Sequence, residues 1–109
     1  MKINLNLIKQ KEEIYRREIS RILYDLSLKK KLPSSSVVYC CLFGEKKKNL
    51  NVYLDFYQND IKHNNLFKIK KNYYFIKKEM MKNKKKYLIP NIFFYLSEEL
   101  NKNNKYDIK

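Results

Sequence analysis

The chain has 109 residues, of which 25 are Lys or Arg and 11 are Asp or Glu, so its formal net charge at pH 7 is +14. A hydrophobic fraction of 44% suffices for one modest core, which excludes wholesale disorder and indicates a single domain. A positive charge of this size attracts polyanions, which makes nucleic acid the first partner to consider. Lysine is also a residue of A/T-rich codons, so part of the excess can reflect nucleotide bias.

Several function classes are disfavoured. No apolar run approaches the ~18 residues that a membrane span needs, and we expect no secretory leader. With Gly44 as the sole glycine, a P-loop, a nucleophile elbow and a dinucleotide-binding motif cannot be built. His63 is the sole histidine, and the two cysteines, Cys40 and Cys41, are adjacent, so these residues cannot provide the ligands of a zinc site. We therefore expect no enzyme, no cofactor and no metal, and a reducing compartment, the cytoplasm or an organelle matrix.

Apolar residues recur with helical spacing over residues 9–28. The stripe at i, i+4, i+7, i+8 and i+11 consists of Tyr15, Ile19, Ile22, Leu23 and Leu26. Arg16, Arg17 and Arg21 lie off this stripe, towards solvent or a partner. A lysine run and Pro33 then end the helix.

Two strands are predicted next. Residues 36–43 (SVVYCCLF) are rich in β-branched and aromatic side chains, and residues 50–56 (LNVYLDF) alternate between apolar and polar side chains. The glycine and lysines of residues 44–49 between them are typical of a hairpin loop. We expect antiparallel pairing, with Val52 and Leu54 in the core and Cys40 and Cys41 on opposite faces.

A long helical region is predicted over residues 60–86, followed by a strand over residues 88–96. One helical face carries the apolar residues Leu66, Ile69, Tyr73, Ile76 and Met80, and the opposite face carries Lys71, Lys78, Lys82 and Lys85. Pro90 suits the beginning of the strand, and Ile92 and Phe94 are expected in the core. Residues 1–100 are thus expected to form one domain, with residues 101–109 as a polar tail.

The predicted order α-β-β-α-α-β indicates an α+β fold in which a three-stranded sheet packs on helices. Three segments in this order resemble the ribosome-binding factor A family of small-subunit assembly proteins: residues 15–23 (YRREISRIL), 50–56 (LNVYLDF) and 75–100 (FIKKEMMKNKKKYLIPNIFFYLSEEL). The resemblance extends over residues 9–100 and implies a type II KH-like domain without the GxxG loop.

The family has an Ala-x-Gly kink between its second and third helices, where this chain has Asn72, Tyr73 and Tyr74. Asn tolerates unusual backbone angles, so a kink at Asn72 stays open. In a straight helix Phe75 would lie on the lysine face, whereas a kink could turn it into the core.

The resemblance implies a non-catalytic factor that binds the immature small ribosomal subunit, assists maturation of its ribosomal RNA and leaves before translation, helped in some lineages by an assembly GTPase. We expect a monomer that does not bind membranes. The alternatives are a permanent ribosomal protein or a general KH-like RNA-binding protein. A DNA-binding protein is disfavoured because neither a dimerisation motif nor a recognition helix is visible.

The residues predicted to contact RNA or the ribosome are basic or lie at the kink: Arg16, Arg17, Lys68, Lys70, Lys71, Asn72, Tyr74, Lys77, Lys78, Lys82, Lys84, Lys85 and Lys86. The alternative for the lysines is a solvated face enlarged by codon bias. Tyr53, Tyr57, Tyr74 and Phe75 could stack on unpaired bases, although tyrosines in such a chain more often fill the core or the surface.

Overall fold

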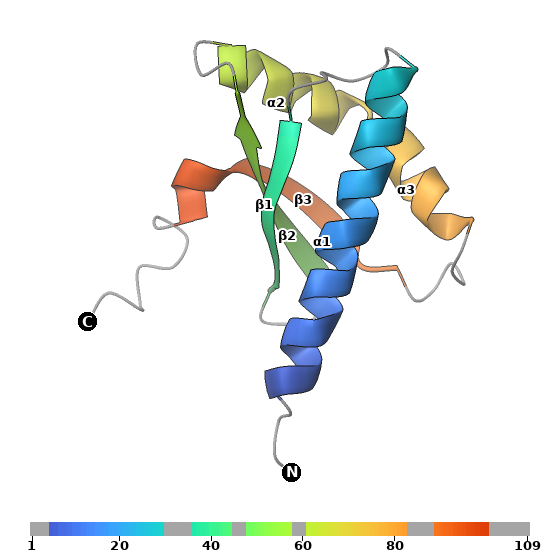
Figure 1. Cartoon of the computed structure of the whole chain (residues 1–109), viewed down its shortest axis with the longest axis vertical. Coiled ribbons are helices and arrows are strands. Elements are labelled where there is room, and N and C mark those ends of the chain that lie inside the picture. The colour runs from blue at the N-terminus through green and yellow to red at the C-terminus, as the bar shows by residue number, and fades with distance from the viewer. Residues whose placement is uncertain (1–4, 30–35, 45–47, 58–60, 83–88, 101–109) are drawn as a thin grey trace.

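A computed structural model describes residues 5–29, 36–44, 48–57, 61–82 and 89–100 (Figure 1). Its order of helices and strands agrees with the order predicted from the sequence. Its elements are α1 (Leu5–Leu28), β1 (Ser36–Phe43), β2 (Asn49–Phe56), α2 (Lys62–Lys71), α3 (Tyr73–Met81), β3 (Asn91–Leu96) and the short 3-10 helix η3 (Ser97–Glu99). The predicted tail at residues 101–109 lies outside the described residues. Among the helices that are described, none is long and apolar enough to span a membrane.

Several boundaries differ from the prediction: α3 ends at Met81, before the predicted end at residue 86, and residues 83–88 lie outside the described residues. Two other differences have a physical reason. Helix α1 begins at Leu5, four residues before the predicted start at residue 9, and Leu7 in this added turn is 47% exposed. This first turn contributes little to the core and therefore does not extend the apolar stripe of α1. Hydrophobic periodicity in the sequence cannot predict it for that reason. Strand β3 begins at Asn91, directly after Pro90, whose ring nitrogen has no hydrogen to donate to a sheet.

The strands form a mixed sheet in the order β1-β2-β3. Strands β1 and β2 pair antiparallel, which confirms the predicted hairpin, whereas β2 and β3 pair parallel. A parallel pair needs a crossover connection, and α2 and α3 provide it. Because β2 lies in the centre, β3 forms an edge of the described sheet, beside which the α2–α3 connection passes.

The hydrophobic core lies between one face of the sheet and all three helices. Leu50, Val52 and Leu54 are completely buried, as the alternation predicted for β2 requires, but Tyr53 on the other face is buried as well, so the prediction of a single buried face is wrong at this position. Ile92 and Phe94 of β3 lie in the same cluster, again as predicted. The helices contribute mainly aliphatic side chains: Ile19, Ile22, Leu23, Leu26, Leu66, Ile69, Ile76 and Met80.

An irregularity in β1 adjusts its pairing with β2. Val38 pairs with Leu54 and Cys40 with Tyr53, so Tyr39 is an extra residue between two consecutive pairs. This bulge shifts the alternation by one position. Val38 and Cys41, three residues apart, are therefore both buried in the core, while Tyr39 is 56% exposed.

The two free cysteines of β1 should react poorly in the native protein. Burial is the main cause that raises the pKa of Cys41 to about 12, and it raises the pKa of Cys40 as well. Since the thiolate is the nucleophile, we expect iodoacetamide at pH 8 to leave Cys41 unmodified in folded protein and to modify it in 8 M urea. Mass spectrometry checks this, and rapid alkylation of native Cys41 would contradict its buried position.

Candidate nucleic-acid interface

The long helical region breaks at Asn72, so the kink that the sequence left open is present. Asn72 ends α2 and begins α3 with φ −98° and ψ 17°, a backbone conformation that does not require glycine. Its side-chain Nδ2 donates a hydrogen bond to the carbonyl oxygen of Lys68 at 2.8 Å. Its backbone N–H also lies within hydrogen-bonding distance of the carbonyls of Lys68 and Ile69. Asn72 therefore caps the end of α2 where the family has Ala-x-Gly.

Six of the predicted lysines lie on the two helices or directly after α3: Lys68, Lys70, Lys71, Lys77, Lys78 and Lys82. All are exposed except Lys77, which is half-buried with its amine 5.8 Å from the centre of the Tyr73 ring. Among the described residues, the only ion pair formed by these six joins Lys82 to Glu79 at 2.9 Å. The remaining predictions, Lys84, Lys85 and Lys86, fall outside the described residues.

The lysines occupy more than one side of the α2–α3 pair. Lys71 and Lys78 project away from the core together with Tyr74, and we call these three residues the outer ridge. Lys70 instead lines a pocket against β3, and Lys77 lies over Tyr73 of that pocket. A separation of two residues corresponds to about 200° around a helix, so Lys68 lies on the flank opposite Lys70. The basic surface thus consists of the outer ridge and two flanks, one with Lys68 and the other with Lys70 and Lys77.

Arg16 and Arg17 are not part of this ridge. Both are on α1 and pair with the carboxylate of Glu13, Arg16 at 2.6 Å and Arg17 at 3.2 Å. Mainly through the hydrogen bond from Arg16, they lower the pKa of Glu13 to about 2. Glu13 therefore stays ionised at neutral pH and offsets one of the two positive charges. The part that Arg16 and Arg17 play in RNA binding stays a prediction.

Exposed aromatic rings accompany the lysines on α2 and α3. Tyr74 is 74% exposed and meets Phe75 edge to face, with ring centres 6.4 Å apart. Phe75 is itself 45% exposed, so the kink does not turn it into the core. Tyr53, a candidate for stacking on bases, is instead buried and stacks on Tyr95. Tyr57 is strongly exposed and keeps a face available.

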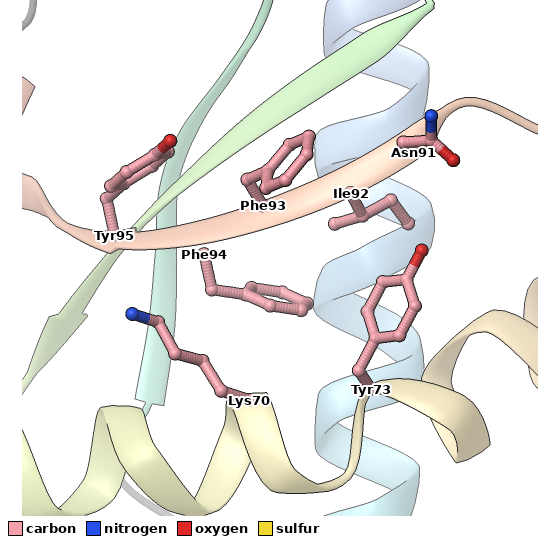
Figure 2. Close-up of a pocket in the computed structure, with 7 residues that line it drawn as sticks. All are labelled: Lys70, Tyr73, Asn91, Ile92, Phe93, Phe94 and Tyr95. Atoms are coloured by element: carbon pink, nitrogen blue, oxygen red, sulfur yellow. The ribbon is translucent and has the colours of Figure 1, made fainter.

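A pocket of about 580 Å³ lies along the outer edge of β3, beside the kink. Its lining comes from α2, α3 and β3: Lys70, Tyr73, Asn91, Ile92, Phe93, Phe94 and Tyr95. Figure 2 shows the rings of Tyr73 and Phe94 between strand and helix, with Phe93 and Tyr95 projecting from the other side of the strand. The pocket therefore reaches both sides of an edge strand.

Sequence reasoning predicted Lys70 as a binding residue but missed most of this pocket. Phe94 was expected only in the core, and it is indeed buried although its ring reaches the pocket wall. Phe93 and Tyr95 carried a usable signal, because alternation in a strand places them opposite Phe94. Their place in the same pocket as Lys70 depends on the parallel pairing of β3 and could not be derived from the strand alone.

Comparisons with known proteins identify the architecture. No family model and no curated protein matches the chain. A solution NMR structure of a Thermotoga maritima protein assigned as a ribosome binding factor A is similar with a TM-score of 0.61 and 18% identity, covering 78% of this chain and 85% of that one. A crystal structure of ribosome-binding factor A from Thermus thermophilus gives a TM-score of 0.58 and 11% identity, covering 80% and 97%. The chain therefore has the fold of the ribosome-binding factor A structures, in which the helices and mixed sheet occur in this arrangement.

Proposed function

We propose that this protein is an assembly factor of the ribosome-binding factor A type, which binds the immature small ribosomal subunit and assists maturation of its ribosomal RNA without catalysing a reaction. The observation that carries the proposal is the outer ridge, on which Lys71 of α2 and Lys78 of α3 are exposed, on a fold shared with two ribosome-binding factor A structures. The three sequence segments that resemble this family support it independently.

The proposed mechanism is positional. Lysine amines contact phosphates as point charges, which places the protein on RNA without reading its sequence. The outer ridge would contact the backbone of a folded RNA surface, with Tyr74 available for a base that is not paired. Binding would stabilise one arrangement of ribosomal RNA helices over another and so shift a population. Release would follow when maturation removes that arrangement, with an assembly GTPase as a candidate partner.

The second candidate function is a permanent ribosomal protein or a general KH-like RNA-binding protein. The same exposed lysines favour it, because phosphate contacts do not distinguish an immature subunit from a mature one. The two functions differ in which particles the protein occupies. We expect purified protein to bind immature small subunits at least tenfold more tightly than mature subunits at equal salt, as measured by pelleting. Equal affinity would favour the permanent ribosomal protein.

Binding to structured RNA should weaken steeply with salt. If the ridge and its flanks neutralise about five to eight phosphates, the slope of log affinity against log salt concentration should be about −4 to −6, because each contact releases condensed counterions. Fluorescence anisotropy with a labelled RNA hairpin between about 50 and 200 mM salt measures this slope. A flat response would contradict binding through phosphate contacts.

A further inference from the structure

The pocket at the edge of β3 has the size and composition of a ligand site. Its volume of about 580 Å³ lies within the ~300–1,000 Å³ typical of small-molecule sites. Four of its seven residues are aromatic, and of these Phe93 is 45% exposed. Rings that are accessible at the free edge of a sheet can stack on a planar partner from solution.

The charge of the pocket indicates the kind of planar partner. Lys70 lines it, Lys77 lies beside it over Tyr73, and none of its described lining residues is acidic. Asn91 adds an amide, which can both donate and accept hydrogen bonds. A cation beside stacked rings and an amide is the combination that binds a phosphate and a base together.

We propose that this pocket binds one unpaired nucleotide of single-stranded RNA. The base stacks on Phe93, and the sugar–phosphate passes around the free edge of β3 to Lys70, because these two side chains line the pocket from opposite sides of the strand. The inference deepens the proposed function and rests on it for the choice of RNA over DNA and for ribosomal RNA as the source of the strand. The pocket and the outer ridge recognise different parts of an RNA. The ridge needs only the phosphates of the RNA backbone, whereas the pocket needs a base that is not paired in a helix.

Because the pocket lies beside the kink at Asn72, the pocket and the outer ridge can bind the same RNA. Lys70 and Lys71 are consecutive, yet Lys70 lines the pocket while Lys71 belongs to the outer ridge. An RNA that crosses the end of α2 can therefore place a paired segment on the ridge and an adjacent unpaired nucleotide in the pocket. A factor with this arrangement would favour RNA in which a helix end is still open.

The test measures binding of a fluorescently labelled single-stranded RNA octamer and of an RNA hairpin to four variants of the full chain. Phe93→Ala removes the exposed ring, and Lys70→Glu reverses the charge at the pocket. Tyr24→Ala and Lys11→Glu are the matched controls, because both residues are exposed on α1 and neither lines the pocket. Circular dichroism confirms that each variant is folded.

We expect Phe93→Ala to weaken octamer binding about tenfold, the usual effect of removing one aromatic ring that stacks on a base, while hairpin binding changes less than twofold. Lys70→Glu should weaken octamer binding more than Lys11→Glu does. Addition of the octamer should also shift the amide NMR signals of Asn91 and Tyr95 before those of Tyr24 on α1. Equal effects of Phe93→Ala and Tyr24→Ala, or unshifted β3 signals at saturation, would overturn the pocket as the site.

Two further outcomes separate this inference from the proposed function. Octamer binding in the pocket without binding to small subunits would refute the proposed function and leave the nucleotide site. Subunit binding that Phe93→Ala and Lys70→Glu leave intact, with no octamer binding, would refute the nucleotide site alone. A DNA octamer that binds as tightly as the RNA octamer would overturn the assignment to RNA.

Discussion

Replacing Lys71 and Lys78 together by Glu is expected to reduce affinity for immature small subunits on the order of 30-fold, because each substitution removes one phosphate contact and adds a repelling charge. Both lysines project from the outer ridge, and neither has an ion-pair partner among the described residues. The salt slope on structured RNA should become flatter by about 2, because two lysines no longer neutralise phosphates. Pelleting with purified subunits measures the affinity, and anisotropy measures the slope.

The matched control replaces Lys9 and Lys11 by Glu. These lysines are exposed on α1, and the double substitution lowers the net charge by the same amount. If nonspecific attraction to a positive protein caused binding, both double variants would bind equally weakly. Such a result would contradict an interface centred on α2 and α3 and would favour codon bias as the origin of the lysines.

Truncating Leu54 to Ala should lower the free energy of unfolding by about 3 kcal/mol, within the range for buried Leu→Ala changes. Leu54 is completely buried in the central strand, where its pairing partners are Val38 of β1 and Leu96 of β3. A cavity at this position would affect both neighbouring strands. Since small domains have only about 5–15 kcal/mol of stability, the loss is large. Urea denaturation followed by circular dichroism measures it.

The control for this variant is Leu28→Ala at the end of α1. Leu28 is 64% exposed, so its truncation should change the free energy of unfolding by less than about 0.5 kcal/mol. The same measurement compares the two variants. Equal stabilities for both would mean that β2 does not lie in the centre of the core.

Most of the fold could be predicted because its apolar patterns are strong and local. The stripe in α1 and the alternation in β2 each identify one buried face, and the predicted positions Ile19 and Leu54 are completely buried. The break at Asn72 was harder to predict, because the apolar stripe continues through it from Ile69 to Ile76. The side-chain hydrogen bond from Asn72 to Lys68, which forms the cap, is seen only in the structure.

Features that depend on long-range packing could not be predicted. The bulge at Tyr39 follows from the register between β1 and β2, whereas an uninterrupted alternation would place Val38 and Cys40 on the same face. The pocket depends on the position of β3 against the kink, which places Phe93 and Lys70 in the lining of one pocket although they are distant in the sequence. The pattern of side chains along one β-strand does not show which strand pairs with it or which helix packs against it.

The basic residues of the candidate interface were found by charge alone, which does not resolve their roles. Arg16 and Lys71 are equally basic in the sequence, yet Arg16 pairs with Glu13 and Lys71 is exposed on the outer ridge. The spacing of Glu13 and Arg16, three residues apart on a helix, is itself a signal for an ion pair. Comparing each lysine and arginine with nearby carboxylates would have separated these two kinds of residue.

The most direct test of the proposed function is the distribution of tagged protein among ribosomal particles from a cell lysate, separated on a density gradient at moderate salt. We expect enrichment in immature small subunits and little protein on mature or translating ribosomes. The enrichment should disappear when Lys71 and Lys78 are replaced by Glu. Equal occupancy of mature subunits, or absence from every ribosomal fraction, would contradict the assembly-factor function.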